Sequence, residues 1–501
     1  MSISQRLYTG EQVKLGEVQA AAKLGIEMYS LMLSAGQAVF DVLRGRYPDA
    51  NDLLIVCGSG NNGGDGFVVA KLAKAAGLKV NIVLTVEASR LHGDAARAKN
   101  DWLSTGGKIR PVSDLPKCVA DADLIVDGIL GTGLSGQVRP DIGAIIDQIN
   151  RSQKPVVSID IPSGLCSDTG DLLGQTVKAQ RTVTFIARKQ GLVTGKARAV
   201  VGELHFSGLG VDHVFASLYP SKVWLLSASQ VNDLVPVRST LAHKGQHGRL
   251  LCLGGNLGYA GAIRMCAQAG VRSGAGLVST LCHSSSSLAL QVACPEVMVS
   301  SWDGDTEALA QAMADKSVIA LGPGLGQDEW ARAMFEVVTS SDTAKVLDAD
   351  GLNLLAKQPC FDARRVITPH PGEAARLIGC SVEQVERDRY QSVTLLQQRY
   401  GGVVVLKGAG TLVCNGDSIA VCTAGNPGMA SGGMGDVLTG VIAALMAQGL
   451  SDFDAACLGV YVHSVAADNL VKESGPIGLA ASDLVPEIRA VLNHLSLTNS
   501  E

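Results

Sequence analysis

Short apolar runs rich in Val, Ile and Leu alternate with segments of helical periodicity along most of the 501-residue chain. The first cycle starts at Leu53 with LLIVCG and continues through KVNIVL, LIVDGILG and VVSIDIP, with helix-like stretches between these runs. A second cycle starts at Arg249 with RLLCLGG and ends in the helix that begins at GGMGDVLTG. Such alternation is typical of parallel sheets that carry helices on both faces. It predicts two α/β domains, the first of them doubly wound.

Residues 211–240 lack a strong period and separate the two cycles. We place the domain boundary in this segment, with one domain at residues 1–222 and the other at residues 227–497. The helix-like sequence before Asp52 is expected to pack on the first sheet. The 58 glycines exceed the usual share of about 7% and indicate many tight turns between strands and helices.

The charge balance excludes some partners. A formal net charge of -5 gives no general attraction to nucleic acid or to an anionic membrane, so any phosphate recognition must be local. The 12 cysteines form no C-x-x-C pair, and MSISQRLYTGEQVK lacks the basic and apolar regions of a signal peptide. The longest apolar stretches are too short to span a bilayer. We expect a cytoplasmic protein with small-molecule substrates and no nucleic-acid or membrane partner. We also expect a homo-oligomer.

The sequence GSGNNGGDG, residues 58–66, places five glycines in nine residues directly after the run LLIVC. Its start fits the pattern G-x-G-x-x-G, and with Glu87 farther on it permits Rossmann-like binding of a dinucleotide by a dehydrogenase. Asp65 is expected at the start of the next helix, where an aspartate is ordinarily an N-cap and where its charge would repel a pyrophosphate. The dehydrogenase hypothesis is therefore the weakest.

The number of glycines in this loop has two explanations. A glycine-rich loop can exist only to turn, but a turn needs one or two glycines, and each costs up to ~0.5–1 kcal/mol in regular structure. The excess favours backbone N–H groups that approach a ligand phosphate. Asn61 and Asn62 would supply neutral amide donors and acceptors, and an amide carbonyl also suits a hard cation.

Two further loops follow strand ends of the predicted first sheet. In DGILGTGLSGQVRP, Asp127 ends a strand and residues 131–137 form a glycine-bearing loop. In SIDIPSGL, Asp160 leaves the strand and Ser163 follows. A strand-end aspartate alone is more often a turn former, but open α/β sheets bind ligands at the carboxyl ends of their strands. Three such loops at one edge therefore indicate a binding site.

Together, LLIVCGSGNNGGDG, VDGILGTGLSGQVR and SIDIPSG resemble the NAD(P)H-hydrate epimerase domain over most of residues 1–220. The resemblance implies a potassium ion held by Asn62, Asp127 and Ser163. It also implies that Asp160 transfers a proton when the configuration of the hydrated nicotinamide carbon is reversed. One departure is LMLSAG, where the family more often has an acidic residue followed by a basic one. The hydrated coenzyme would contact Asn61, Asn62, Gly63, Gly64, Asp65, Gly131, Thr132, Gly133, Leu134, Ser135, Gly136, Gln137 and Asp160.

In the second half, GGMGDVLTG places Asp436 at a helix start behind consecutive glycines. Backbone N–H groups there would form an anion hole, and the helix dipole adds about 0.3–1 kcal/mol for a negative charge. An aspartate at this position is otherwise an ordinary cap. Lys407 in KGAGT suits nucleotide phosphates and, equally, a strand-end lysine that extends into water. PHPGE places His370 and Glu373 at another strand end, although a single histidine is more often a hydrogen-bonded polar residue than a ligand.

The motifs HKGQHGRLLCLGG, ALGPGLG, TPHPGE, LKGAGT and SGGMGD, in this order, resemble ribokinase-like NAD(P)H-hydrate dehydratases over nearly all of residues 227–497. The resemblance implies a ribokinase-like α/β domain in which Asp436 is the base that primes the C6 hydroxyl group. It implies ADP with Mg²⁺ as the phosphoryl source, whereas the residues themselves leave ADP or ATP open. The hydrated coenzyme would lie near Ala262, Gly324 or Gly326, His370 and Asp436. The adenine nucleotide would contact Lys407, Gly408, Ala409, Gly410, Thr411 and Gly435.

The combined prediction is a bifunctional repair enzyme, both isomerase and lyase. Its first domain would interconvert the R and S forms of hydrated NADH or NADPH, and its second would dehydrate the S form. A rival hypothesis is a small-molecule kinase of the vitamin or sugar type, with a nucleotide-binding regulatory domain and a stable phosphorylated product. In a third, the first domain is an inert binding module, so that Asp127 and Asp160 tolerate replacement.

Overall fold

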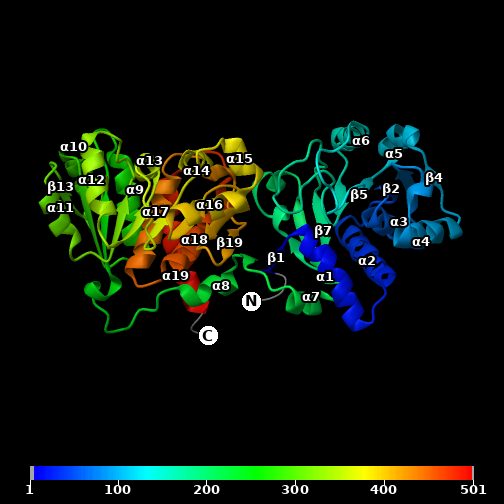
Figure 1. Ribbon diagram of the computed structural model, residues 1–501, viewed down its shortest axis with the longest axis horizontal. Helices are drawn as coiled ribbons and strands as arrows, with labels where there is room; N and C mark the ends of the chain where they lie inside the picture. Colours follow the sequence, from blue (N-terminus) through cyan, green and yellow to red (C-terminus); the bar gives the residue numbers. More distant parts are fainter. Residues whose placement is uncertain (1–4, 499–501) are drawn as a thin grey trace. The chain divides into compact units, whose positions relative to one another are not determined.

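The computed structural model describes residues 5–498 and divides into two compact units, Met1–Trp224 and Leu225–Glu501 (Figure 1). The division falls inside the aperiodic segment 211–240. Each unit contains its own sheet, and the two are described separately. Within residues 5–498, no helix has both the length and the apolar character that a membrane span requires.

Unit 1, residues Met1–Trp224, is built on a seven-stranded parallel sheet with the order β4-β3-β2-β5-β6-β7-β9. The strands are β2 (Asp52–Cys57), β3 (Lys79–Leu84), β4 (Ile109–Arg110), β5 (Leu124–Gly128), β6 (Val156–Ile159), β7 (Arg181–Phe185) and β9 (Glu203–Ser207). The helices are α1 (Gly10–Leu24), α2 (Met28–Arg46), α3 (Asn61–Ala75), α4 (Gly93–Ser104), α5 (Leu115–Asp121), α6 (Pro140–Arg151) and α7 (Asp212–Leu218). A separate parallel pair joins β1 (Leu7–Tyr8) to β8 (Arg188–Lys189).

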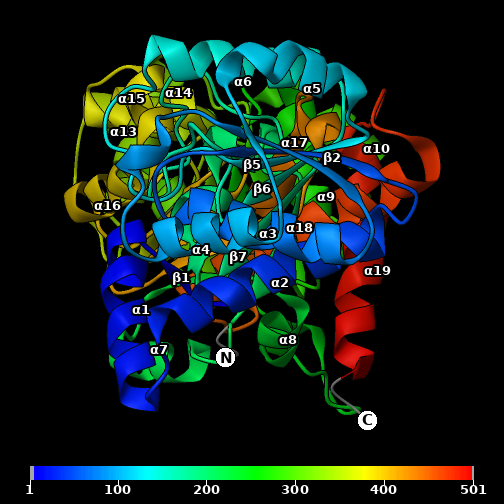
Figure 2. The same ribbon diagram turned by 90° about the vertical axis from the view of Figure 1, so that its right-hand side faces the viewer.

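The sheet of unit 1 has a core on each face. Because side chains alternate along a strand, Leu53 and Ile55 of β2 join the core formed with α2, α3 and α4, whereas Leu54 and Val56 join the core of α5 and α6. Figure 2 shows α5 and α6 on one face and α2, α3 and α4 on the other. The predicted doubly wound sheet is confirmed, and α1 and α2 add apolar residues to its larger core.

The glycines between residues 58 and 66 are explained largely by packing inside unit 1. A Cβ on Gly58 would lie 1.9 Å from the carbonyl oxygen of Ile129, and one on Gly63 would lie 2.1 Å from that of Gly58. The next two glycines are similarly close to side chains of neighbouring elements. At Gly60, in contrast, no atom of the described chain lies within 4 Å of the added Cβ. Packing of α3 on the sheet and its neighbours therefore accounts for four of these five glycines, whereas Gly60 meets open space. The approach of backbone N–H groups to a ligand phosphate stays a prediction.

Asp65 does not start the helix, so its predicted N-cap role was wrong. Helix α3 already begins at Asn61, and Gly60 is its N-cap without any side-chain hydrogen bond. Asp65 therefore lies in the second turn, where only 8% of its surface is exposed. The helix begins early because glycine at the N-cap costs only a few tenths of a kcal/mol relative to a polar cap.

Unit 2, residues Leu225–Glu501, is built on a ten-stranded sheet with the order β10-β19-β18-β17-β16-β15-β14-β11-β12-β13. In this order, the strands from β17 through β16, β15, β14, β11 and β12 to β13 run parallel to one another. Strands β17, β18 and β19 pair antiparallel. The strands are β10 (Val223–Leu225), β11 (Arg249–Leu253), β12 (Leu277–Cys282), β13 (Met298–Ser301), β14 (Val318–Leu321), β15 (Ala344–Leu347), β16 (Arg365–Ile367), β17 (Val403–Leu406), β18 (Thr411–Cys414) and β19 (Ile419–Cys422).

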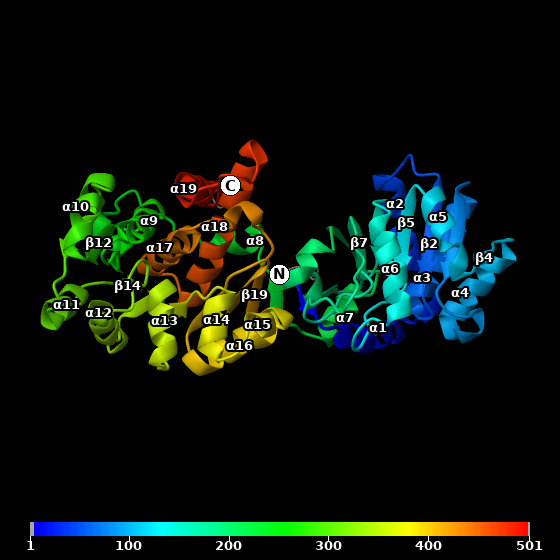
Figure 3. The ribbon, with the colours of Figure 1, turned by 90° about the horizontal axis from the view of Figure 1, so that it is seen from above.

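Helices cover both faces of this sheet. Figure 3 shows α9, α17 and α19 on one side and α12, α13, α14 and α16 on the other. Helix α17 is buried on all sides from Val437 to Ala447, as expected for a helix that is apolar all round. The main helices are α8 (Ala228–Val231), α9 (Ala260–Arg272), α10 (Ser284–Ala293), α11 (Thr306–Met313), α12 (Glu329–Thr339), α13 (Ala349–Lys357), α14 (Pro371–Ile378), α15 (Val382–Arg387), α16 (Arg389–Tyr400), α17 (Met434–Ala447), α18 (Asp452–Ser474) and α19 (Ala481–Thr498).

Candidate active sites

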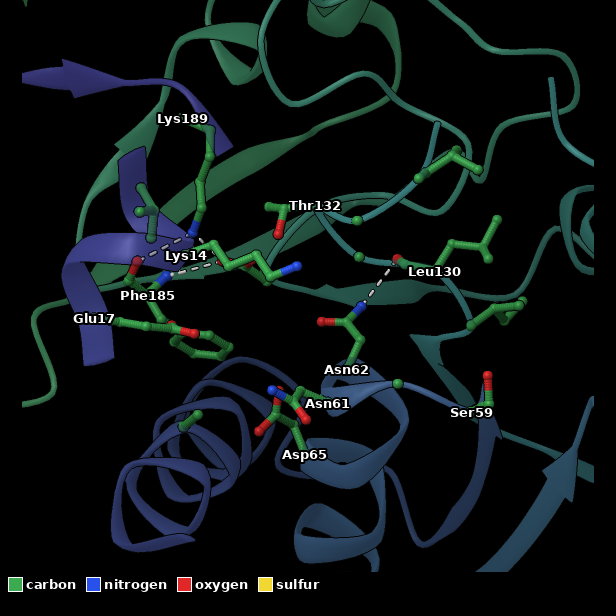
Figure 4. A pocket seen from close by; sticks show the side chains of 18 of the residues that line it. Lys14, Glu17, Ser59, Asn61, Asn62, Asp65, Leu130, Thr132, Phe185 and Lys189 are labelled. Atoms are coloured by element: carbon green, nitrogen blue, oxygen red, sulfur yellow. Dashed lines mark hydrogen bonds and ion pairs between the residues drawn. The ribbon is translucent and has the colours of Figure 1, made fainter. Parts of the chain in front are cut away.

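A cavity of about 740 Å³ lies at the carboxyl ends of β2, β5 and β6 in unit 1 (Figure 4). Most of the residues predicted for the first site contribute to its wall. They are Asn61, Asn62, Asp65, Gly131, Thr132, Gly133, Leu134, Ser135, Gln137 and Asp160. Gly63 and Gly64 pack instead on neighbouring parts of the unit, and Gly136 takes a positive φ of 75° in its loop.

Asp160 has a strained backbone conformation, and hydrogen bonds fix its carboxylate. Its φ of 62° is left-handed, which is uncommon for a residue other than glycine and costs of order 1–3 kcal/mol. Its Oδ1 accepts hydrogen bonds from the ammonium group of Lys189, from the hydroxyl of Thr184 at 3.1 Å and from the N–H of Phe185 at 3.2 Å. The Lys189 side chain is only 1% exposed, and it also donates to Thr184 Oγ1 and the Phe185 carbonyl. This network fixes both members of the ion pair.

Two more carboxyl groups face the same lysine. Burial and, to a smaller extent, Asp160 raise the pKa of Glu17 to about 7, against the opposing effects of Lys189 and Lys14. Burial, and then Asp160 and Glu17, hold the pKa of Asp65 well above its ordinary value. We call Lys189, Asp160, Glu17 and Asp65 the Lys189 cluster. It combines an ion pair with two carboxyl groups that favour their protonated form.

The three residues predicted to hold potassium come together beside this cavity. Asn62 donates to the carbonyl oxygens of Leu130 and Ile159, at 3.0 Å each. Asp127 is fully buried at the end of β5 and accepts from the hydroxyl of Ser163 at 2.5 Å and from its N–H at 2.9 Å. Burial raises the pKa of Asp127 despite these hydrogen bonds. The site is thus rich in oxygen atoms and contains a buried carboxylate.

In unit 2, Asp436 lies in the first turn of α17, as predicted. The N-cap is Gly433, whose φ of 90° is left-handed and suits glycine. Burial and, to a smaller extent, Asp348 raise the pKa of Asp436 to about 7, against the opposing effect of Lys407. Asp436 is therefore poised to exchange a proton near neutral pH.

A second lysine, 19% exposed at its side chain, lies next to Asp436. Lys407 Nζ is 2.8 Å from Asp348 Oδ1 and 3.9 Å from Glu373, while Asp348 Oδ2 accepts from the hydroxyl of Thr439. Burial by itself would raise the pKa of Asp348, but Lys407 and the hydroxyl donors lower it. Burial raises the pKa of Glu373 to about 7, against the effect of Lys407. We call Lys407, Asp348, Glu373 and Asp436 the Lys407 cluster. Lys407 thus does not extend into water.

Gly435 contacts this cluster directly, because a Cβ there would lie 3.1 Å from Lys407 Nζ and 3.2 Å from Asp348 Oδ2. His370 caps α14 by accepting the N–H of Gly372 at 3.0 Å, which is the hydrogen-bonded role that a single histidine more often takes. Burial lowers the pKa of His370, and Lys407 lowers it further.

The remaining predicted residues of unit 2 lie in two regions. In the first, Ala262 at the start of α9 is next to Gly324, where an added Cβ would lie 3.2 Å from that of Ala262. The N–H of Gly326 donates to Asp350 at 3.0 Å. In the second, Lys407, Gly408, Ala409 and Gly410 join β17 to β18, and Thr411, the first residue of β18, donates to the Gly408 carbonyl at 3.1 Å.

Sequence reasoning missed Glu17, Lys189 and Asp348 as site residues. In KVLDADG, Asp348 follows the last residue of β15 directly, so the strand-end rule that selected Asp127 could have found it. Lys189 follows the strand TVTFIA closely and carried a weaker signal. Glu17 lies inside α1, and nothing in its local sequence indicates a site.

Two family models match the chain. One, described as YjeF-related protein N-terminus, covers residues 28–191, and the other, described as NAD(P)H-hydrate dehydratase, covers residues 250–490. The bifunctional NAD(P)H-hydrate repair enzyme of Vibrio cholerae is 48% identical over 98% of this chain and 99% of its own length. The enzyme of the same name from Escherichia coli is 47% identical over 98% of this chain and 95% of its own length.

Solved structures resemble the C-terminal part. The ADP/ATP-dependent NAD(P)H-hydrate dehydratase from Bacillus subtilis, co-crystallised with ATP and Mg²⁺, has a TM-score of 0.51 and 28% identity, covering 54% of this chain and 98% of its own. A ribokinase-like superfamily protein from Enterococcus faecalis has a TM-score of 0.52 and 28% identity, covering 56% of this chain and 98% of its own. The fold and the two clusters define an α/β enzyme with a Rossmann-like unit and a ribokinase-like unit. The chain belongs to the family of bifunctional NAD(P)H-hydrate repair enzymes.

Proposed function

We propose that this chain repairs hydrated NADH and NADPH at two sites, one in each unit. Unit 1 interconverts the R and S forms, with Asp160 as a proton-transfer residue. Unit 2 dehydrates the S form at the expense of ADP, with Asp436 as the base. The observation that carries the proposal is the position of Asp436 in the first turn of α17, beside the Lys407 cluster, in a chain of this family.

The chemistry of unit 2 follows from the poor leaving ability of hydroxide. Phosphorylation of the hydroxyl group makes its departure easy. The lone pair of the ring nitrogen expels the phosphate and forms a C=N bond, and loss of a proton from the adjacent ring carbon then gives the C=C bond of the intact coenzyme. Asp436 takes the hydroxyl proton during attack on the phosphoryl group, and N–H groups at the start of α17 hold the developing negative charge. Gly435 leaves room for this approach next to Lys407. The loop at residues 407–411 contacts the nucleotide.

Two cations belong to this proposal. Asn62, Asp127 and Ser163 would hold potassium, because they place an amide, a buried carboxylate and a hydroxyl together, and a cation would compensate the buried charge of Asp127. Among residues 5–498, no group of three or more His, Cys, Asp or Glu side chains forms a metal centre. Mg²⁺ therefore fits best when nucleotide oxygens supply most of its ligands, and there it would neutralise phosphate charge.

The proposal is tested by giving the purified chain a mixture of both hydrate epimers with ADP and following the recovery of nicotinamide absorbance. The wild-type chain recovers both epimers. Asp436→Asn recovers neither, while Asp160→Asn recovers the S form and leaves the R form behind. Full recovery by either variant contradicts the assignment.

The same experiment separates the rival functions. A vitamin or sugar kinase would release a stable phosphorylated product, which mass spectrometry detects, whereas repair releases inorganic phosphate and the intact coenzyme. An inert first unit would leave R-form repair unchanged in Asp160→Asn. The domain limits 1–222 and 227–497, assembly as a homo-oligomer and a cytoplasmic location stay predictions.

A further inference from the structure

Glu17 lines the unit 1 cavity from helix α1, which precedes the segment 28–191 matched by the family model. The other members of the Lys189 cluster reach the same cavity from α3, from the end of β6 and from β8. Figure 4 shows Glu17, Lys14, Asp65 and Lys189 around one pocket. Glu17 is therefore placed where a bound substrate can touch it.

Helix α1 is held firmly enough to position a catalytic group. Thr9 closes its N-terminus with a capping box, and the N–H of Gly10 donates to Asp168 at 2.6 Å. Gly16 packs so closely on α7 that an added Cβ would lie 2.4 Å from the ring of Phe215. Glu17 follows Gly16 directly, so the same packing that fixes the helix also fixes the start of this side chain.

The charges in the cavity divide the carboxyl groups into two kinds. Lys189 donates to Asp160, Thr184 Oγ1 and the Phe185 carbonyl, which uses all three of its hydrogens. Within residues 5–498, neither Glu17 nor Asp65 has a cation within ion-pair distance. Two carboxyl groups without such a partner next to a paired carboxylate retain protons, because like charges at short range disfavour ionisation. The wall thus offers a base, Asp160, and at least one acid.

Glu17 is better suited than Asp65 to act as the acid. Asp65 is only 8% exposed within α3, and burial, followed by Asp160 and Glu17, holds its pKa well above the ordinary value. The pKa of Glu17 is raised to about 7, first by burial and then by Asp160, against Lys189 and Lys14. A group that titrates near neutral pH can both give and take a proton during turnover.

We propose that Glu17 is the second catalytic residue of the epimerase site, an inference that rests on the proposed function of unit 1. The hydrated carbon carries a hydroxyl group and the ring nitrogen, so ring opening allows its configuration to be reversed. Asp160 takes the hydroxyl proton, the O–H electron pair forms a C=O bond, and the C–N bond breaks with its pair on nitrogen. Glu17 gives its proton to that nitrogen. Rotation and the reverse steps close the ring on the other face and return both protons.

The test compares Glu17→Gln with Glu11→Gln in the full chain, because Glu11 is an exposed residue of the same helix. We expect Glu17→Gln to lower the rate of R-to-S conversion by roughly 10²-fold or more, the usual contribution of a positioned acid. Glu11→Gln keeps the wild-type rate. Both variants retain wild-type dehydration of pure S hydrate with ADP, which shows that unit 2 is intact. Glu17→Asp, which keeps an acid, recovers part of the lost rate.

The rate of R-to-S conversion by the wild-type chain, measured against pH, is a second readout. It does not depend on the folding of a variant. Because Glu17 acts in its protonated form, R-to-S conversion falls about tenfold per pH unit above pH 7. The groups that face Glu17 are Lys14, Asp65, Asp160 and Lys189, and Asp94 and Arg139 also line the cavity. Glu17→Gln removes this limb of the profile.

The outcomes separate this inference from the proposed function. If the wild-type chain does not convert R to S, the proposed function of unit 1 is wrong and the inference falls with it. If the wild-type chain converts the epimers but Glu17→Gln does so equally fast, the function stands and the role of Glu17 is refuted. A wild-type profile that stays level above pH 7 also refutes it.

Discussion

The Lys189 and Lys407 clusters use the same components in different pairings. Each has one lysine among three carboxyl groups, buried in unit 1 and partly buried in unit 2, and in each the lysine forms a close ion pair with one of them. In unit 1 the paired carboxylate is Asp160, the proposed base itself. In unit 2 the paired carboxylate is Asp348, and the proposed base, Asp436, is left with a pKa of about 7.

This difference shows two ways to prepare a carboxylate for proton transfer. Pairing with Lys189 keeps Asp160 oriented, and a neighbouring acid then supplies the second proton. In unit 2, Lys407 and Asp348 hold each other, so Asp436 is free to take a proton while the cluster keeps a positive group near the phosphoryl site. A lysine next to a proposed catalytic aspartate therefore does not have the same task in both units.

Removal of the proposed base of unit 2 should have the largest effect. We expect Asp436→Asn to lower the rate of dehydration by roughly 10²–10⁴-fold. The urea midpoint of unfolding should not fall, because burial and the charge of Asp348 both disfavour the charged form of Asp436. An uncharged asparagine avoids this cost. Steady-state rates and urea titrations on the variant and on Asp342→Asn, an exposed control, check both points. A large loss of stability would mean that Asp436 is structural.

Removal of Lys407 tests how much its ion pair with Asp348 stabilises unit 2. Lys407→Met leaves Asp348, 2% exposed at the side chain, without its cation. Breaking such a buried pair costs about 3–5 kcal/mol. We expect a matching loss in the free energy of unfolding for Lys407→Met, measured by urea titration, and almost none for Lys472→Met on the exposed surface of α18. Equal stability of the two variants would show that the pair contributes little.

The glycines next to the two sites also differ. Gly58→Ala drives a Cβ against the Ile129 carbonyl at 1.9 Å, so we expect a loss of about 1–3 kcal/mol in stability. Gly60→Ala, which meets open space, should lower the thermal midpoint less, because it only exchanges the glycine N-cap of α3 for the poorer alanine. In unit 2, Gly435→Ala crowds Lys407 and Asp348 and should slow dehydration more than it lowers stability. A tolerated Gly58→Ala would undo the packing explanation of the loop.

The pH dependence gives the smallest expected effect and separates the sites by sign. Asp436 acts as a base, so dehydration should fall about tenfold per pH unit below pH 7 and level off above it. This limb belongs to the Lys407 cluster as a whole, because Glu373 also titrates near pH 7. Epimerisation should instead fall above pH 7. Initial rates of the two reactions across pH 5–9 measure both limbs, and limbs of the same sign would contradict the assigned roles.

The features that the sequence predicted correctly are those that local sequence patterns determine. Alternating apolar runs and helical segments gave both sheets, and strand-end motifs identified the cavity loops and the position of Asp436 in the first turn of α17. It failed for Glu17 and Lys189, because a distant helix and a two-residue strand bring them to the cavity. Asp65 was misplaced because a helix can start at a glycine without a side-chain cap.

The most direct test of two separate proton-transfer sites is to mix the variants Asp160→Asn and Asp436→Asn. Each chain keeps one working site, so the mixture should convert R hydrate and ADP into intact coenzyme, AMP and phosphate, although neither variant does so alone above the spontaneous rate. Recovery by the mixture supports the account. A mixture that fails to repair R hydrate, or a single variant that succeeds, would contradict it.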